Sequence, residues 1–105
     1  MDEESEVRRV VDMVSYQEGA VVSRVVIKRK SGKVTLFAFD AGQELSEHTT
    51  PYDALVQLVE GEAAITVAGR PHRLREGEML LMPAHQPHAL RAVTRFKMLL
   101  TMIHS

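Results

Sequence analysis

The sequence predicts a single all-β domain, built as a sandwich or a barrel. Two observations indicate this class. From Val21 onward the hydrophobic residues alternate with a period of two, and turn residues interrupt the chain every ten or so positions without a long helical pattern between them. The chain has 105 residues, which suits one domain with one hydrophobic core.

The first predicted element is a hairpin. Residues 21–28 and 34–39 alternate as strands do, and Lys30, Ser31, Gly32 and Lys33 separate them. Arg29, Lys30 and Lys33 are interpreted as solvated charges of this hairpin loop. Four further strands are expected at 54–60, 63–68, 79–82 and 95–103.

The residues before the hairpin are expected to form a separate arm. Val7, Val10, Val11 and Val14 follow the spacing of one helical face, and acidic residues and Ser5 precede them, which favours a short helix. Because β-branched residues resist helix formation, an irregular arm is the alternative. The predicted organisation is an arm or short helix over residues 1–13 and a barrel over 14–105.

Composition limits the classes of partner. Thirteen Lys and Arg against fourteen Asp and Glu give a net charge of −1, which predicts no nucleic-acid binding. Without cysteine there can be no disulfide, thiolate metal site or cysteine nucleophile. The acidic start and the lack of an apolar stretch of about 18 residues predict a cytoplasmic protein without a membrane partner.

Histidine spacing carries the functional prediction. The segment with Gly42, His48 and Gly61 and the segment with Gly77, Pro83 and His88 are spaced like the two sequence motifs of the cupin family. The chain therefore resembles a small single-domain cupin of the conserved-barrel type. This resemblance implies a double-stranded β-helix, also called a jelly-roll barrel, with one internal pocket.

The resemblance also implies a metal site, which this chain matches in part. Thr50 stands where the family has its second histidine, and Ala54 stands where it has a glutamate. His85 replaces a motif glycine and Ala92 a motif asparagine. His48 and His88 therefore remain as the metal ligands, for a divalent transition metal such as Zn, Fe, Mn or Ni.

Two readings of these histidines are open. A third donor could come from Thr50, water or His85, since such metals usually take three or four side-chain ligands. Alternatively, the histidines bond to each other, to Thr50 or to water in a metal-free pocket. The expected ligand pocket is lined by His48, Thr50, Val56, Leu58, Met82, His85, His88 and Phe39.

The predicted function is binding of a small molecule in the barrel, with or without a divalent metal. The alternative is a metal-dependent oxygenase or isomerase with a reduced ligand set, and a scaffold without a ligand is a third possibility. Leu55 and Val59 are apolar on the outward parity, and residues 96–103 are apolar on both faces. We therefore expect a second sheet from another subunit, in a homodimer.

Overall fold

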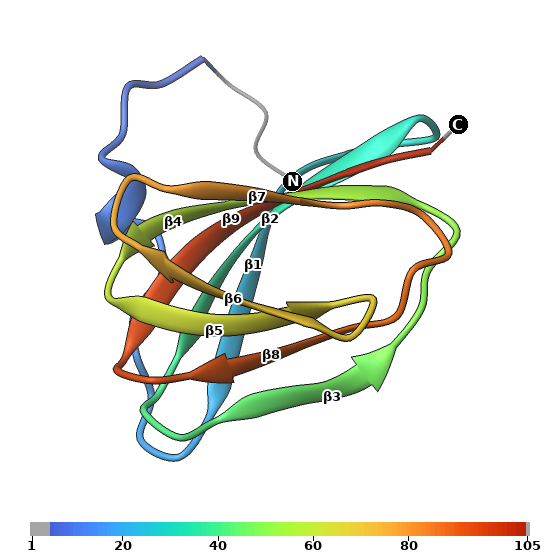
Figure 1. The fold of residues 1–105 in the computed structure, drawn as a ribbon. Coiled ribbons are helices and arrows are strands. Elements are labelled where there is room, and N and C mark those ends of the chain that lie inside the picture. Colours follow the sequence, from blue (N-terminus) through green and yellow to red (C-terminus); the bar gives the residue numbers. More distant parts are fainter. Residues whose placement is uncertain (1–4, 105) are drawn as a thin grey trace.

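The computed structural model describes residues 5–104 and consists of two β-sheets packed face to face (Figure 1). One sheet has five strands in the order β1-β2-β9-β4-β7, and the other has four in the order β3-β8-β5-β6. All neighbouring strands are antiparallel. The strands are β1 (Val21–Arg29), β2 (Gly32–Phe39), β3 (Glu44–His48), β4 (Asp53–Glu60), β5 (Glu62–Val67), β6 (Arg70–Arg75), β7 (Met79–Met82), β8 (His88–Ala92) and β9 (Phe96–Ile103).

The core lies between the two sheets and follows from side-chain alternation. On β4, Ala54, Val56 and Leu58 are buried, whereas the residues between them are partly or fully exposed. Phe39 of β2 and Phe96 of β9 stack with their ring centroids 4.4 Å apart, and both are fully buried. The predicted all-β class and the inward face of β4 are therefore confirmed.

The arm forms no regular helix over its described residues. The helical element found there is the 3₁₀ turn η1 (Val10–Asp12), and of the four valines only Val14 is buried. The helical spacing was misleading because the arm bends at Met13 and Val14 and continues without regular structure over the outer face of the five-stranded sheet, where Val14 packs with Leu36 and Ala38. Residues 1–4 lie outside the described part of the chain.

Three strands were not foreseen from the sequence, and all belong to the four-stranded sheet. β3 and β6 are its two edges, and β6 has one buried residue, Leu74, so hydrophobic alternation is almost absent from it. β6 begins with Arg70 and Pro71, and proline is tolerated there because β6 is an edge strand. The third, β8, follows a short loop after β7 and ends in Ala92.

No helix among residues 5–104 is long and apolar enough to cross a membrane.

Candidate functional site

His48 and His88 meet at one end of the barrel. His48 is the last residue of β3, His88 is the first of β8, and the two are cross-strand partners. A register shift in β3 between Leu45 and His48 brings His48 opposite His88. His88 is buried and His48 is exposed, so this histidine pair connects the interior to the solvent.

The two imidazoles face each other through the same ring nitrogen. Nε2 of His48 lies 3.1 Å from Nε2 of His88, and the rings meet edge to face. Each Nδ1 lies beside the carbonyl oxygen two residues earlier, at 2.8 Å for Ser46 and 3.2 Å for Gln86. The local backbone thus orients both rings in the same way.

The partners of the ring nitrogens limit where the protons lie. A carbonyl oxygen only accepts hydrogen bonds, so the contact at each Nδ1 is a hydrogen bond in the tautomer that carries its proton on Nδ1. When both neutral rings are in this tautomer, each Nε2 carries a lone pair, and a proton or a metal ion bound by the two nitrogens relieves their repulsion. When one ring carries its proton on Nε2 instead, the contact is an N–H···N hydrogen bond between neutral rings.

The electrostatic surroundings of His88 favour its neutral form. Burial lowers the pKa of His88 below its ordinary value, and the nearby His48 lowers it further. The Gln86 carbonyl acts in the opposite direction on the same pKa but is the smallest cause. A neutral imidazole is the form that binds metals.

The spacing of the nitrogens suits a shared metal ion. A metal about 2.1 Å from each nitrogen holds them about 3.0 Å apart at a right angle and about 3.4 Å apart at the tetrahedral angle. The 3.1 Å between the two Nε2 atoms lies within this interval. Metal-bound histidines commonly donate their second N–H to a backbone carbonyl, and each Nδ1 here has a carbonyl oxygen within hydrogen-bond distance.

A third protein ligand is not in place among residues 5–104, which contain no group of three or more His, Cys, Asp and Glu side chains able to hold a metal. The Thr50 hydroxyl donates to the Tyr52 carbonyl, and buried Ala54 has no donor atom. The Asp53 carboxylate accepts a hydrogen bond from the Ala84 backbone N–H and is exposed. Any further ligands would therefore be water or a bound molecule.

The other expected pocket residues lie at different depths. His85 is exposed in the loop between β7 and β8, and its backbone N–H donates to the Thr50 carbonyl at 2.8 Å. Met82 pairs with Ala54 at the histidine end of β4. Leu58 lies four residues beyond Ala54, or about 13 Å along the strand. Phe39, Val56, Leu58 and Met82 all belong to the packed core.

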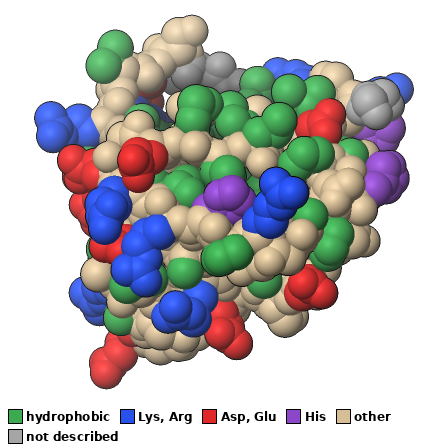
Figure 2. Space-filling view, viewed as in Figure 1, with side chains coloured by type: hydrophobic (Ala, Val, Ile, Leu, Met, Phe, Trp, Pro, Cys, Tyr) green, Lys and Arg blue, Asp and Glu red, His purple; other side chains and the backbone are tan. Residues whose placement is uncertain are grey.

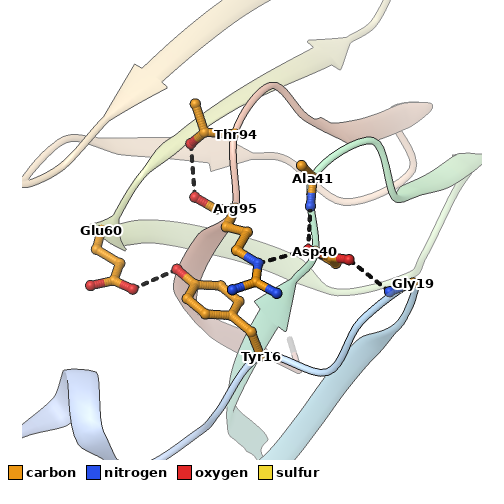
Figure 3. Close-up of polar contacts among 7 residues, drawn as sticks. All are labelled: Tyr16, Gly19, Asp40, Ala41, Glu60, Thr94 and Arg95. Carbon is orange, nitrogen blue, oxygen red and sulfur yellow. Dashed lines mark hydrogen bonds and ion pairs between the residues drawn. The ribbon is translucent and has the colours of Figure 1, made fainter.

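A second polar cluster lies at the other end of β4, and sequence analysis missed it (Figure 3). The Tyr16 hydroxyl donates to Glu60 at 2.5 Å, and the Arg95 guanidinium and the Lys97 ammonium lie 5.0 and 4.9 Å from the centre of the Tyr16 ring. Arg95 also donates to Asp40 at 2.7 Å. Burial, followed by the hydrogen bond to Glu60, raises the pKa of Tyr16 above its ordinary value.

This cluster attaches the arm to the barrel. Lys97 is largely buried and donates from Nζ to the Val11 carbonyl at 2.6 Å, while Arg24 donates to the Met13 carbonyl. Sequence offers a weak signal for it, namely a lysine within the apolar run of β9. The cluster is structural, and the histidine end of the barrel is the candidate functional site.

Comparison with known proteins agrees with this fold. The family model described as the cupin domain matches residues 35–104, which is two thirds of the chain. The chain belongs to the cupin family. No curated protein matches this cupin.

Several solved structures resemble this cupin. A conserved protein of unknown function from Streptococcus pyogenes has 36% sequence identity and a TM-score of 0.93, over 99% of this chain and 91% of that one. A cupin superfamily protein from Desulfitobacterium hafniense has 28% identity and a TM-score of 0.89, over 100% and 95%.

A more distant structure shares the fold alone. The salicylate 1,2-dioxygenase from Pseudaminobacter salicylatoxidans has 18% identity and a TM-score of 0.75, over 81% of this cupin and 26% of that chain.

Proposed function

We propose that this cupin binds a small molecule at the histidine end of its barrel, through a divalent transition metal held by His48 and His88. The observation that carries the proposal is the convergence of two Nε2 atoms at 3.1 Å, each ring being oriented by a carbonyl on Nδ1. A metal ion between them removes the repulsion of the two lone pairs and meets the second-shell pattern of metal-bound histidine.

A site with two protein ligands leaves several coordination positions open. A bound metal would supply Lewis-acid polarisation of a ligand oxygen. In this proposal the chain's own residues give shape and access: exposed His48 faces the incoming molecule, buried His88 holds the inner side, and Thr50 and His85 border the entrance.

The apolar residues would form the base of the proposed pocket. These are Met82 nearest the histidine pair, then Val56 and Leu58 deeper in the core, and Phe39 beyond them, opposite Phe96. Small-molecule sites are mostly apolar with a few placed polar groups, which is the composition of this set.

The test is metal content of untagged protein purified without chelator. We expect close to one equivalent of a divalent transition metal in the wild type, and its loss in His48→Gln and His88→Gln. His72→Gln is the matched control, because His72 is an exposed histidine of the same sheet. Circular dichroism of each variant separates metal loss from unfolding, and His48→Gln is decisive because His48 is exposed. Metal-free wild-type protein that also fails to take up Zn²⁺ or Fe²⁺ would contradict the proposal.

The open coordination positions favour a second candidate function, a metal-dependent oxygenase or isomerase. Catalytic metal sites keep a position for water or substrate, whereas closed structural sites do not. The identity of the metal separates the candidates: native iron supports an oxygenase, because oxygen chemistry needs a redox-active metal. Protein that binds a small molecule equally well with and without metal would favour a simple binding module.

We further propose that the chain is a homodimer, assembled through the outer face of the five-stranded sheet. Met79, Leu81 and Ile103 are each more than half exposed there, next to Leu55, the cross-strand partner of Leu81. Figure 2 shows hydrophobic side chains gathered along its upper part, where Figure 1 places β7. A contiguous apolar face on a small domain is typical of a subunit interface.

Light scattering at micromolar concentration tests the dimer. We expect about twice the chain's mass for the wild type and the monomer mass for Leu81→Lys, because a buried lysine ammonium is costly without a partner. His72→Lys, on exposed β6 of the other sheet, is the matched control and should leave the mass unchanged. A monomeric wild type would refute this assembly and leave the metal proposal untouched.

A further inference from the structure

A pocket lies at the tip of the β1–β2 hairpin. It has a volume of about 190 Å³ and, among the described residues, is lined by Lys28, Arg29, Lys30, Gly32, Lys33, Tyr52 and Met102. We call this set the basic pocket. Four of its seven residues are cationic, and none is acidic.

The strand register brings the charges together on one face. Lys28 is the cross-strand partner of Lys33, and Lys33 is the partner of Met102 on β9. Like charges directly opposite each other in a sheet reduce its stability, so the pairing of Lys28 with Lys33 lowers the stability of the hairpin. Among residues 5–104, the ion pairs involve neither Lys28, Lys30 nor Lys33. Within the described part of the chain, these three lysines are therefore available to an anionic ligand.

The remaining wall of the pocket is apolar and aromatic. Tyr52 is half-buried, and its ring meets the His104 ring edge to face with centroids 5.1 Å apart. Met102 is also half-buried, and its neighbour across the sheet is Ala54. A ligand here would thus contact cations on one side and an apolar surface on the other.

The basic pocket lies at the same end of the barrel as the histidine pair. In Figure 1 the hairpin tip extends beyond the barrel near the C-terminal end of the chain, on the side where β3 ends and β8 begins. Tyr52 follows Thr50 by two residues, and the Thr50 carbonyl accepts the His85 N–H. The lining does not include the histidine pair, so the inference drawn from this pocket is independent of metal binding.

We propose that the basic pocket binds the anionic group of a small organic anion, a phosphate or a carboxylate, with the apolar part of the molecule against Tyr52 and Met102. The volume supports a head group rather than a whole large ligand, since sites for drug-sized molecules measure roughly 300–1,000 Å³. The net charge of −1 and the small size of the basic surface argue against nucleic acid as the occupant.

The test uses metal-free protein and defined probes in calorimetric or NMR titrations at low salt. Phenyl phosphate and benzoate report the two anionic groups, inorganic phosphate reports the charge alone, and phenol is the neutral control. We expect phenyl phosphate or benzoate to bind more tightly than inorganic phosphate and phenol, with shifts centred on the hairpin tip and Tyr52. Binding should weaken as salt is raised, because exposed charges are screened.

Variants assign the binding to the pocket. Lys28→Gln with Lys33→Gln should weaken the tighter probe by roughly two- to thirtyfold, the combined effect of two exposed charge contacts. Arg70→Gln with Arg91→Gln removes the same charge from exposed positions of the other sheet and should change binding by less than about twofold. Thermal denaturation of both double variants verifies that they fold.

Three outcomes would overturn the proposal. These are no probe binding at millimolar concentration, equal loss in both double variants, or tighter binding of a short DNA oligonucleotide than of either organic anion. If the histidine variants retain anion binding while losing metal, the basic pocket stands on its own. If the lysine variants retain metal while losing the anion, the two sites are likewise separable.

Discussion

Gly61, at the β4–β5 turn, provides a sharp test of why a glycine stands at this motif position. Its φ is +83°, and a Cβ added there would collide with the Arg95 carbonyl oxygen and lie 2.8 Å from the Phe96 Cβ. Both contacts are with the start of β9, whose Phe96 is fully buried in the core. Gly61→Ala therefore combines backbone strain with a collision that only movement of the backbone can relieve.

Gly42 is the matched control, because it has φ of +80° and nothing within 4 Å of an added Cβ. Gly42→Ala should cost only the strain of a left-handed conformation, about 1–2 kcal/mol. Gly61→Ala adds overpacking of about 1–3 kcal/mol, for a total of about 2–5 kcal/mol. Against a total stability of about 5–15 kcal/mol, this loss is large enough to leave the variant marginally folded.

Urea denaturation followed by circular dichroism measures the difference. With an m-value of about 1.5 kcal/mol/M, Gly42→Ala should lower the midpoint by about 1 M and Gly61→Ala by about 1.5–3 M. If Gly61→Ala does not fold, its soluble yield should be lower than that of Gly42→Ala, which ranks the two variants in the same order of stability. Equal midpoints for the two variants would refute the argument from the Arg95 contact.

Two further predictions follow from the site and from the cluster of Figure 3. Thr50→His should raise the affinity for Zn²⁺ at least about tenfold, because a third imidazole completes a catalytic-type ligand set with His48 and His88. Competition with a chromogenic chelator measures this affinity. Unchanged affinity would show that position 50 does not face the metal. The hydrogen bond from Arg95, with that from the Gly19 N–H, lowers the pKa of Asp40 to about 2. Asp40 therefore stabilises the folded state above a pH of about 4, and this contribution is lost as the pH falls toward 2. Asp40→Asn should show a smaller drop in unfolding free energy over that interval than the wild type, and parallel curves would count against the pair.

Much of the five-stranded sheet was predictable because its signal is local. Val56 and Leu58 fall on the buried face of β4 as the alternation requires, since the direction of a side chain in a strand depends only on its position along that strand. The hairpin of β1 and β2 was predictable for the same reason. The edge strand β6 was not, because its backbone hydrogen bonds to β5 rather than its own side chains make it a strand.

The candidate site was predictable in part. Family resemblance singled out His48 and His88 as partners, and the structure brings them together, but the orientation of the rings depends on the carbonyls of Ser46 and Gln86. From the sequence, Lys33 was interpreted as a solvated charge of the hairpin loop. Its position in a pocket depends on Tyr52 and other residues outside the hairpin.

By itself, the order of residues determined the class of fold and the faces of the central strands, because alternation and turn chemistry act between neighbours in the chain. The tertiary structure alone decided which distant residues are in contact. It places two imidazole nitrogens next to each other, attaches the arm to the barrel through Tyr16 and Lys97, and brings lysines close to Tyr52. These contacts join residues far apart in the sequence, as much as 86 positions for Lys97 and Val11. The chain must close on itself before any attraction or repulsion between such residues exists.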